Sequence, residues 1–422
     1  MMIFTSIYSV VDGFFVSNFV GKQEFAALNL VFPFIMIIGS FGFMMGTGGS
    51  AIVAKTLGEG DAESANGYFS FLCIATVVGG TALSVLGVVF IRPISILLGA
   101  EGKIVDYCVI YGTIMISAMP AFMLQNMFQA FFVVAEKPKI GLIVTLIAGC
   151  TNIVGDALLV GVFRFGLVGA AIASALGQLI GGIVPLFYFT RKNNSLLRLN
   201  KPKAQWSVLF KTCTNGSSEL MSNISMSLVN MLYNYQLYRI AGEDGISAYG
   251  VIMYVNFIFV AIFIGYSIGC APLVSYNHGA KNHAELKNLY KKSILSMLIT
   301  GALMTTLALS LSTPLSKIFV GYDASLTEMT AIGFRFFSAC FLFSGINIFA
   351  SSFFTALNNG LISAILSFIR TLVFQIASVM LLPLLISPEI SGVWISVVVA
   401  EILAFALSTI FLFAMRKKYN YT

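Results

Sequence analysis

The chain has 422 residues, of which 58% are apolar and only 10% are charged, and its mean hydropathy is +0.93. A soluble protein of this length cannot bury so much apolar surface, so the composition excludes an ordinary pair of soluble domains. The net charge of +7 would suit nucleic acid, but the sequence has no basic helix or basic patch interleaved with aromatic residues, and we expect no nucleic-acid partner. The composition therefore predicts the lipid bilayer as the partner.

Apolar runs in chain order predict about twelve membrane-spanning helices. Most approach or exceed the roughly 20 residues that cross a bilayer, and no run alternates like a transmembrane β-strand. We therefore expect an all-α membrane protein. The predicted spans are 1–20, 25–54, 67–91, 105–134, 140–161, 167–190, 213–240, 246–275, 293–312, 328–356, 361–385 and 392–415.

The lysines and arginines predict the topology. An even number of spans puts both termini on one side. Sixteen of these cations fall in loops on that side and six in the opposite loops, while Arg335 and Arg370 lie within spans. The excess of positive charge in cytoplasmic loops then places both termini, and the linker 191–211, in the cytoplasm. We expect a multi-pass protein of the inner (plasma) membrane.

An internal repeat divides the chain into two halves. Each half has about six helices, so the halves share one orientation and are related by an axis along the membrane normal, with a substrate site expected between them. We predict an N-lobe at 1–200 and a C-lobe at 201–422. The alignment pairs Met1 with Ser222, inside the seventh helix, which predicts that the natural chain begins earlier. The pairs 221 positions apart are Gly21 with Gly242, Gly48 with Gly269, Gly58 with Gly279, Asn126 with Asn347 and Phe128 with Phe349, and Gly169 lies 223 before Gly392.

Several short stretches with a recognisable order and spacing occur along both halves. In the first half they are Tyr8–Ser17 with Gly21, Gly46–Gly48, Asn152–Asp156 and Gly169–Ala171, and in the second half Gly216–Glu219 and Pro272–Ala280. The first set resembles the multidrug and toxic compound extrusion (MATE) family, and the second set is similar to its MepA-like branch. The resemblance implies two six-helix lobes in a V around a central cavity, and export of organic cations against an inward flow of H⁺ or Na⁺. The family belongs to a wider group that includes lipid-linked oligosaccharide flippases.

Two aspartates in the first half predict an ion-coupling site. A charge near the bilayer centre costs about 3 kcal/mol or more, and Asp12 lies halfway along the first apolar run. Asp156 follows Asn152 by four residues, so both lie on one helical face. With Ser174 of the sixth helix, they would bind protons as a coupled carboxylate pair or bind Na⁺ through oxygen ligands. Packing for Asp12 and an interfacial position for Asp156 are the alternatives.

The resemblance bears on these roles residue by residue. In the DinF-type branch, the residues that match Asp12, Asn152 and Asp156 are the N-lobe residues implicated in ion coupling. The helix-seven glutamate of NorM-type members would fall nearer Ser227, so that role does not carry over to Glu219.

The second half contributes further charged residues. Glu219 is either a substrate-binding carboxylate or a residue that favours a helix N-terminus. Arg370 and Glu401 lie in the adjacent helices eleven and twelve, where we expect a buried structural pair, with substrate or proton binding by Glu401 as the alternative. Within the predicted membrane spans, acidic residues outnumber basic ones, which favours a cationic substrate. The expected substrate-binding set is Asp12, Asp156, Glu219 and Glu401.

These patterns together predict a monomeric secondary active exporter of drugs or other small organic cations. H⁺ or Na⁺ is the coupling ion, and no other cofactor is expected. No Ser/His/Asp or Cys/His arrangement points to an enzyme. The alternative is a flippase for lipid-linked precursors, whose cavity should be cationic to hold pyrophosphate; a channel or receptor is a third, more distant reading.

Overall fold

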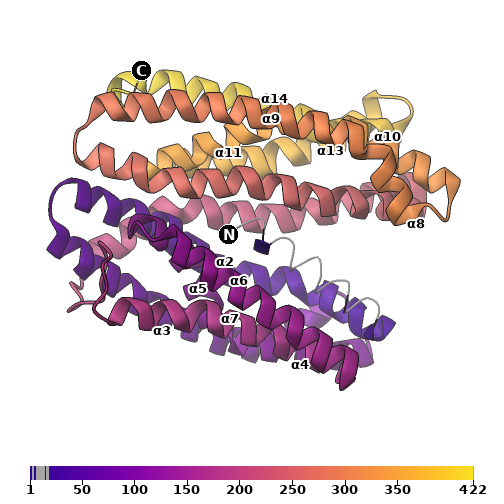
Figure 1. Cartoon of the computed structure of the whole chain (residues 1–422). Helices are drawn as coiled ribbons and strands as arrows, with labels where there is room; N and C mark the ends of the chain where they lie inside the picture. Colours follow the sequence, from indigo (N-terminus) through magenta and orange to yellow (C-terminus); the bar gives the residue numbers. More distant parts are fainter. Residues whose placement is uncertain (2–3, 6–14, 16–18, 422) are drawn as a thin grey trace. The chain divides into compact units, whose positions relative to one another are not determined.

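The computed structural model describes residues 1, 4–5, 15 and 19–421, and these form helices joined by short connections (Figure 1). No strand occurs among the residues described, which confirms the all-α prediction. The helices of the first half are α2 (Lys22–Gly58), α3 (Ala62–Leu97), α4 (Lys103–Ser117), α5 (Met119–Val134), α6 (Pro138–Gly155), the π-helical η1 (Asp156–Val162) and α7 (Gly166–Thr190). Those that follow are α8 (Trp206–Gly279), α9 (His283–Val320), α10 (Ala324–Ser338), α11 (Phe341–Ala356), α12 (Gly360–Phe368), the π-helical η2 (Ile369–Phe374), α13 (Gln375–Leu385), α14 (Glu389–Ala414) and α15 (Arg416–Tyr419).

The lengths of these helices match a multi-pass membrane protein. Within the described ranges, eight helices are long and apolar enough to cross a bilayer, and ten spans result if each of two bent pairs is one span. The bent pairs are α4 with α5, at 51°, and α10 with α11, at 48°. Pro120, at the start of α5, contributes to the first bend because proline cannot donate a backbone hydrogen bond. The predicted first span lies mostly outside the described residues.

α8 contains two successive helical segments. Gly242 has a φ of 63°, a left-handed conformation that favours glycine and interrupts the helix. Its counterpart 221 positions earlier, Gly21, is the N-cap residue of α2. The two predicted spans at 213–240 and 246–275 are therefore both present in α8, on either side of this glycine.

The backbone repeats between the two halves, as the sequence predicts. Asp61 caps the N-terminus of α3 by accepting a hydrogen bond from Ser64 N. Its counterpart 221 positions later, Asn282, caps α9 by accepting one from Glu285 N. These caps satisfy amides that have no partner within the helix. Equivalent helices therefore begin at equivalent residues.

A one-residue change in the repeat occurs at a π-helical turn. Glu136 and Asn358, which are 222 apart, both have left-handed backbone, with φ of 55° and 57°. Further on, Gly169 packs against the Leu159 carbonyl as Gly392 packs against the Leu382 carbonyl, and these pairs are 223 apart. π-Helical turns, which accommodate one additional residue, lie between these two points in both halves, η1 in the first and η2 in the second. The offset therefore changes from 222 to 223 within the stretch that contains these turns.

The chain forms two compact units, Met1–Leu220 and Met221–Thr422. The division falls within α8 and not at the 200/201 boundary expected from the sequence. The first turns of α8 belong to unit 1 because glycines allow them to pack closely on α2. A Cβ atom added at Gly48 would collide with the Thr212 carbonyl oxygen, and one added at Gly216 would collide with that of Met44.

We expect Gly216→Ala to destabilise unit 1 by about 1–3 kcal/mol, because the added methyl group meets backbone that cannot move aside. The measurement is thermal unfolding of the purified protein in detergent. Gly250→Ala is the matched control on the same helix, since nothing lies within 4 Å of a Cβ there, and alanine is the better helix former. Equal midpoints for the two variants would contradict the close contact between α2 and α8.

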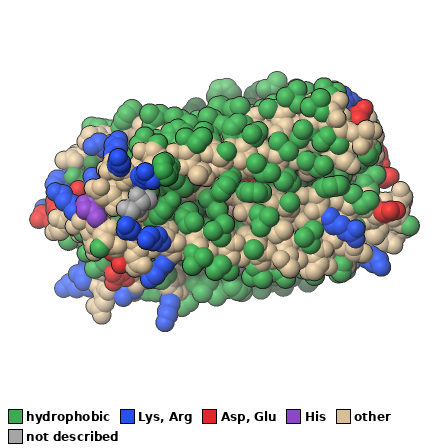
Figure 2. Space-filling view, turned by 90° about the horizontal axis from the view of Figure 1, so that it is seen from above, with side chains coloured by type: hydrophobic (Ala, Val, Ile, Leu, Met, Phe, Trp, Pro, Cys, Tyr) green, Lys and Arg blue, Asp and Glu red, His purple; other side chains and the backbone are tan. Residues whose placement is uncertain are grey.

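Large apolar side chains are exposed along the helices, as expected for a surface that faces lipid. Val78, Leu86 and Val89 of α3 are 62%, 53% and 65% exposed. Figure 2 shows hydrophobic side chains across the middle of the visible face, with lysine and arginine gathered mainly at the end that also carries histidine. Both histidines of the chain, His278 and His283, flank the connection between α8 and α9.

Candidate functional site

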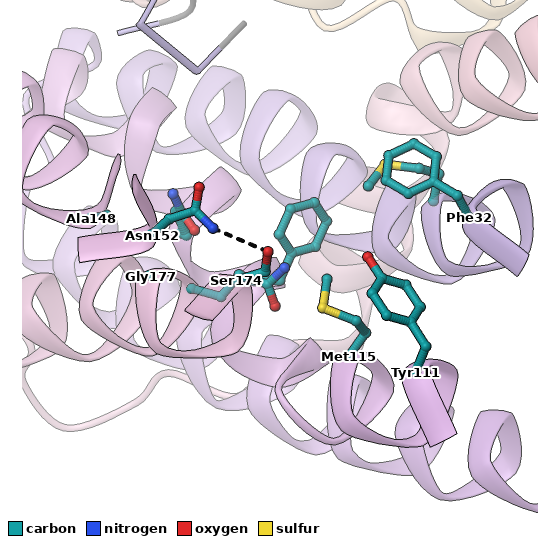
Figure 3. Close-up of a pocket in the computed structure, with 11 residues that line it drawn as sticks. Phe32, Tyr111, Met115, Ala148, Asn152, Ser174 and Gly177 are labelled. Atoms are coloured by element: carbon teal, nitrogen blue, oxygen red, sulfur yellow. Dashed lines mark hydrogen bonds between the residues drawn. The ribbon is translucent and has the colours of Figure 1, made fainter. Parts of the chain in front are cut away.

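Unit 1 contains a cavity of about 90 Å³ among five of its helices (Figure 3). α2 and α4 contribute mostly apolar side chains, whereas α5, α6 and α7 contribute amides and a hydroxyl. The lining residues are Phe32, Met36, Tyr111, Met115, Phe122, Gln125, Ala148, Asn152, Ser174, Gly177 and Gln178.

Close packing of α6 on α7 forms the polar side of this cavity. A Cβ atom on Gly177 would lie 3.0 Å from the Ala148 carbonyl oxygen and 3.3 Å from Asn152 Cβ, so only a glycine fits at this crossing without a shift. The short separation lets Asn152 Nδ2 donate a hydrogen bond to Ser174 Oγ at 3.1 Å, drawn as a dashed line in Figure 3. The two residues that the sequence analysis grouped from adjacent helices are therefore in direct contact.

Three amide oxygens at the cavity are buried acceptors. Gln125 Oε1, Asn152 Oδ1 and Gln178 Oε1 are inaccessible, and they have no hydrogen-bond partner within the described part of the chain. A buried acceptor left without a donor costs about 1–3 kcal/mol, and native proteins normally satisfy such groups with protein, water or a bound molecule. Turned toward the cavity, these oxygens would favour an occupant that donates hydrogen bonds or carries positive charge.

Aromatic and thioether groups form the opposite side of the cavity. In Figure 3 the side chains of Tyr111 and Met115, both from α4, point toward the space beside the Asn152–Ser174 pair, and Phe32 of α2 lies near them. Aromatic faces attract cations, and methionine adapts its shape to different ligands. A cavity of about 90 Å³ is well below the roughly 300 Å³ of a typical drug pocket. It fits an ion with its waters, or the cationic head of a larger molecule.

Two other predicted residues of unit 1, Asp156 and Glu219, do not line this cavity. Asp156 is 0% exposed and opens η1, one turn beyond Asn152. π-Helical turns occur frequently at functional sites. Glu219 is half-buried on the early part of α8, which belongs to unit 1. Asp12 lies outside the described residues.

In unit 2 the structure places Arg370 and Glu401 in direct contact. Arg370 Nη2 lies 2.9 Å from Glu401 Oε1, and the side chains are 18% and 6% exposed. Arg370 Nε also donates to both carboxylate oxygens, at 3.0 and 3.1 Å. Glu401, expected as a possible substrate ligand, thus has a charged partner within its own unit.

Sequence reasoning missed most of the cavity lining. It weighed charged groups and the residues near them, so it singled out Asn152 and Ser174 but neither Gln125 nor Gln178. The sequence signal that could have identified these two glutamines is a single amide residue within an apolar span. The aromatic and methionine lining carried no such signal, because lipid-facing positions use the same residue types.

Comparison with known proteins identifies the chain. The MatE family model matches residues 1–158 and 220–381, one segment in each half of the repeat. The chain belongs to the MatE family. It is therefore a membrane transporter of the multidrug and toxic compound extrusion type and not an enzyme.

Individual relatives agree with this assignment to the MatE family. The chain is 26% identical over 317 residues to the multidrug export protein MepA of Staphylococcus haemolyticus, covering 74% of this chain and 69% of that protein. It is 22% identical over 424 residues to MepA of Staphylococcus aureus, covering 98% and 90%. A crystal structure of MATE in complex with MaL6 has a TM-score of 0.94 at 20% identity, covering 100% of this chain and 95% of that one. The resemblance to the MepA-like branch is confirmed.

Proposed function

We propose that this MatE-family protein is a secondary active multidrug exporter that exchanges small organic cations for H⁺ or Na⁺. The cavity of unit 1 would hold either the cationic head of the substrate or the coupling ion. The observation that carries the proposal is a cavity whose lining combines aromatic side chains with three amide residues, each of which has a buried oxygen without a donor among the described residues. The MepA relatives, named as multidrug export proteins, support the substrate class.

The cavity favours a cation over an anion because its lining includes no lysine and no arginine. A lipid-linked precursor would bring a pyrophosphate, which requires positively charged partners. The flippase alternative therefore fits this cavity less well than a cation exporter does.

Coupling requires only that the ion and the substrate prefer different conformations. We propose that Asp156, with Asp12, exchanges H⁺ or Na⁺ next to the Asn152–Ser174 pair. Binding of the ion neutralises buried negative charge and weakens the attraction for a cationic substrate, which leaves outward. Release of the ion into the cytoplasm restores that attraction. Alternating access of the two lobes remains the expected transport mode.

The same proposal covers topology and assembly. The excess of lysine and arginine on one side favours the plasma membrane with both termini in the cytoplasm. The partners are then drugs or other small organic cations and the bilayer lipids, with the monomer as the working unit and no cofactor besides the coupling ion.

The decisive experiment measures ethidium accumulation in cells that express the protein, with the pH and Na⁺ gradients varied separately. The proposal predicts lower accumulation than in control cells, and loss of the difference when one of the two gradients is collapsed. The gradient that matters identifies the coupling ion. Equal accumulation with and without the protein, under both gradients, would refute the exporter assignment.

Asn152→Leu should reduce ethidium affinity at least about tenfold, because it removes an acceptor and the contact with Ser174 while keeping the number of side-chain heavy atoms and the branch at Cγ. Equilibrium binding to purified protein provides the measurement. Thr151→Val is the matched control, since Thr151 neighbours Asn152 but does not line the cavity. Unchanged affinity in Asn152→Leu would remove this cavity from substrate binding.

A further inference from the structure

The repeat assigns each residue of the unit 1 cavity a counterpart in unit 2. Gln178 corresponds to Glu401 at the offset of 223, which the Gly169 and Gly392 contacts establish on the same helices. Arg370 is the second residue of η2, where the offset changes, so it corresponds to Ala148 at the offset of 222 or to Ile147 at 223. Glu401 therefore stands at the position of a residue that lines the unit 1 cavity, and Arg370 is its ion-pair partner.

A third residue completes the cluster in unit 2. Asn347 of α11, the counterpart of Asn126, donates from Nδ2 to Glu401 Oε2 at 2.7 Å and to the Glu401 carbonyl oxygen at 3.0 Å. Asn347 is 1% exposed, and its Oδ1 is a buried acceptor without a partner among the described residues. Unit 2 thus presents a carboxylate at the counterpart of the cavity-lining Gln178, together with an amide oxygen at the counterpart of Asn126, which does not line the unit 1 cavity.

The two units differ in what fills this position. In unit 1 a methyl group at Ala148 and a neutral amide at Gln178 leave room for a cavity. In unit 2 a guanidinium group lies against the carboxylate, at 2.9 Å. A guanidinium is itself an organic cation with several N–H donors, so Arg370 supplies the kind of group that the unit 1 cavity lacks.

We propose that Glu401 and Asn347 form a second organic-cation site, in unit 2, and that the guanidinium of Arg370 occupies it as a tethered ligand. The ligand class is small guanidinium or amine cations with N–H donors. Arg370 is then a specificity-determining residue, because its side chain blocks this site and restricts the substrate to the cavity of unit 1. This last consequence depends on the proposed export function, whereas the site itself does not.

Tethering explains why a free cation does not displace the arginine in the wild-type protein. A group held on a short link has an effective concentration of millimolar or more. Arg370 also makes several charge-assisted hydrogen bonds to one carboxylate, the stronger class of hydrogen bond. A cation at micromolar concentration therefore does not compete until the side chain is removed.

The test uses the purified full-length chain and ethylguanidinium as the probe. Arg370→Ala should unfold at a lower temperature than the wild type, because Glu401 loses its charged partner. Ethylguanidinium at about ten times its dissociation constant should then raise the midpoint of Arg370→Ala by about 3–5 °C. The wild type and Arg370→Ala/Glu401→Gln should not respond.

Two further comparisons keep the test decisive. Asn152→Leu/Arg370→Ala should respond to ethylguanidinium as Arg370→Ala does, which separates this site from the unit 1 cavity and from ethidium export. If Arg370→Ala is recovered folded only when ethylguanidinium is present during extraction, the site is supported. An equal response of all variants, or failure of Arg370→Ala to fold with and without the probe, would overturn the proposal.

Discussion

Asp156→Asn should reduce gradient-driven ethidium efflux to the background of cells without the protein, while the protein still folds. Asp156 is fully buried where α6 passes into η1, one turn from Asn152. Asparagine keeps the shape of the side chain but cannot take up a proton or carry the charge that binds Na⁺. Without that exchange the ion and the substrate no longer favour different conformations, so transport loses its driving force. Efflux rates, normalised to the amount of protein in the membrane, measure the effect.

Asp12→Asn should have the same effect if the two aspartates act as one coupled site. Glu63→Gln is the matched control, because Glu63 is an exposed acidic residue at the start of α3 and its change also removes one negative charge. Full efflux by folded Asp156→Asn protein would refute the role assigned to this carboxylate. Full efflux by Asp12→Asn alone would restrict the site to Asp156 and its neighbours.

The second large effect concerns the stability of unit 2. Glu401→Ala should lower the free energy of unfolding by about 3–5 kcal/mol, because it leaves the guanidinium of Arg370 buried without its countercharge. The two side chains are only 18% and 6% exposed, so water cannot replace the lost partner. Arg370→Met/Glu401→Leu should recover most of that loss, since a well-packed apolar pair of similar volume removes both charges together.

A double-mutant cycle, measured by thermal unfolding in detergent, separates pairing from packing. It compares Arg370→Met and Glu401→Leu with the double variant, and we expect the single changes to be strongly non-additive. Additive effects would show that the ion pair adds nothing to the stability of unit 2. Arg239 and Glu389, an exposed pair at 3.6 Å with side chains 47% and 59% exposed, provide the comparison, because exposed pairs contribute only about 0–1 kcal/mol.

Much of the architecture follows from local properties of the chain. Apolar runs long enough to cross a bilayer form helices wherever they occur, because lipid offers the backbone no other hydrogen-bond partner. The repeat followed from glycine, asparagine and phenylalanine residues at a constant spacing, and the equivalent caps at Asp61 and Asn282 confirm it in the structure. Contact between Arg370 and Glu401 was anticipated because two opposite charges in adjacent apolar helices have few other partners.

The membership of the unit 1 cavity was not predictable in the same way. Gln125 and Gln178 are single amides in apolar spans, and nothing along the chain states which way an amide points. Their convergence depends on how each helix is rotated about its axis, which is decided by close contacts such as that of Gly177 with the Ala148 carbonyl. Such contacts join residues from different helices.

By itself, then, the amino-acid sequence determined that this protein is a bundle of membrane-spanning helices with two similar halves and a few charges at depth, because length, hydropathy and spacing act within each helix. The tertiary structure alone decided which polar groups share a site. A π-helical turn adds one residue, which rotates all that follows by about 100° around the helix axis. η1 and η2 introduce such turns in both halves, and the neighbouring helices then decide whether a polar group lines a cavity, as Gln178 does, or meets an arginine, as Glu401 does.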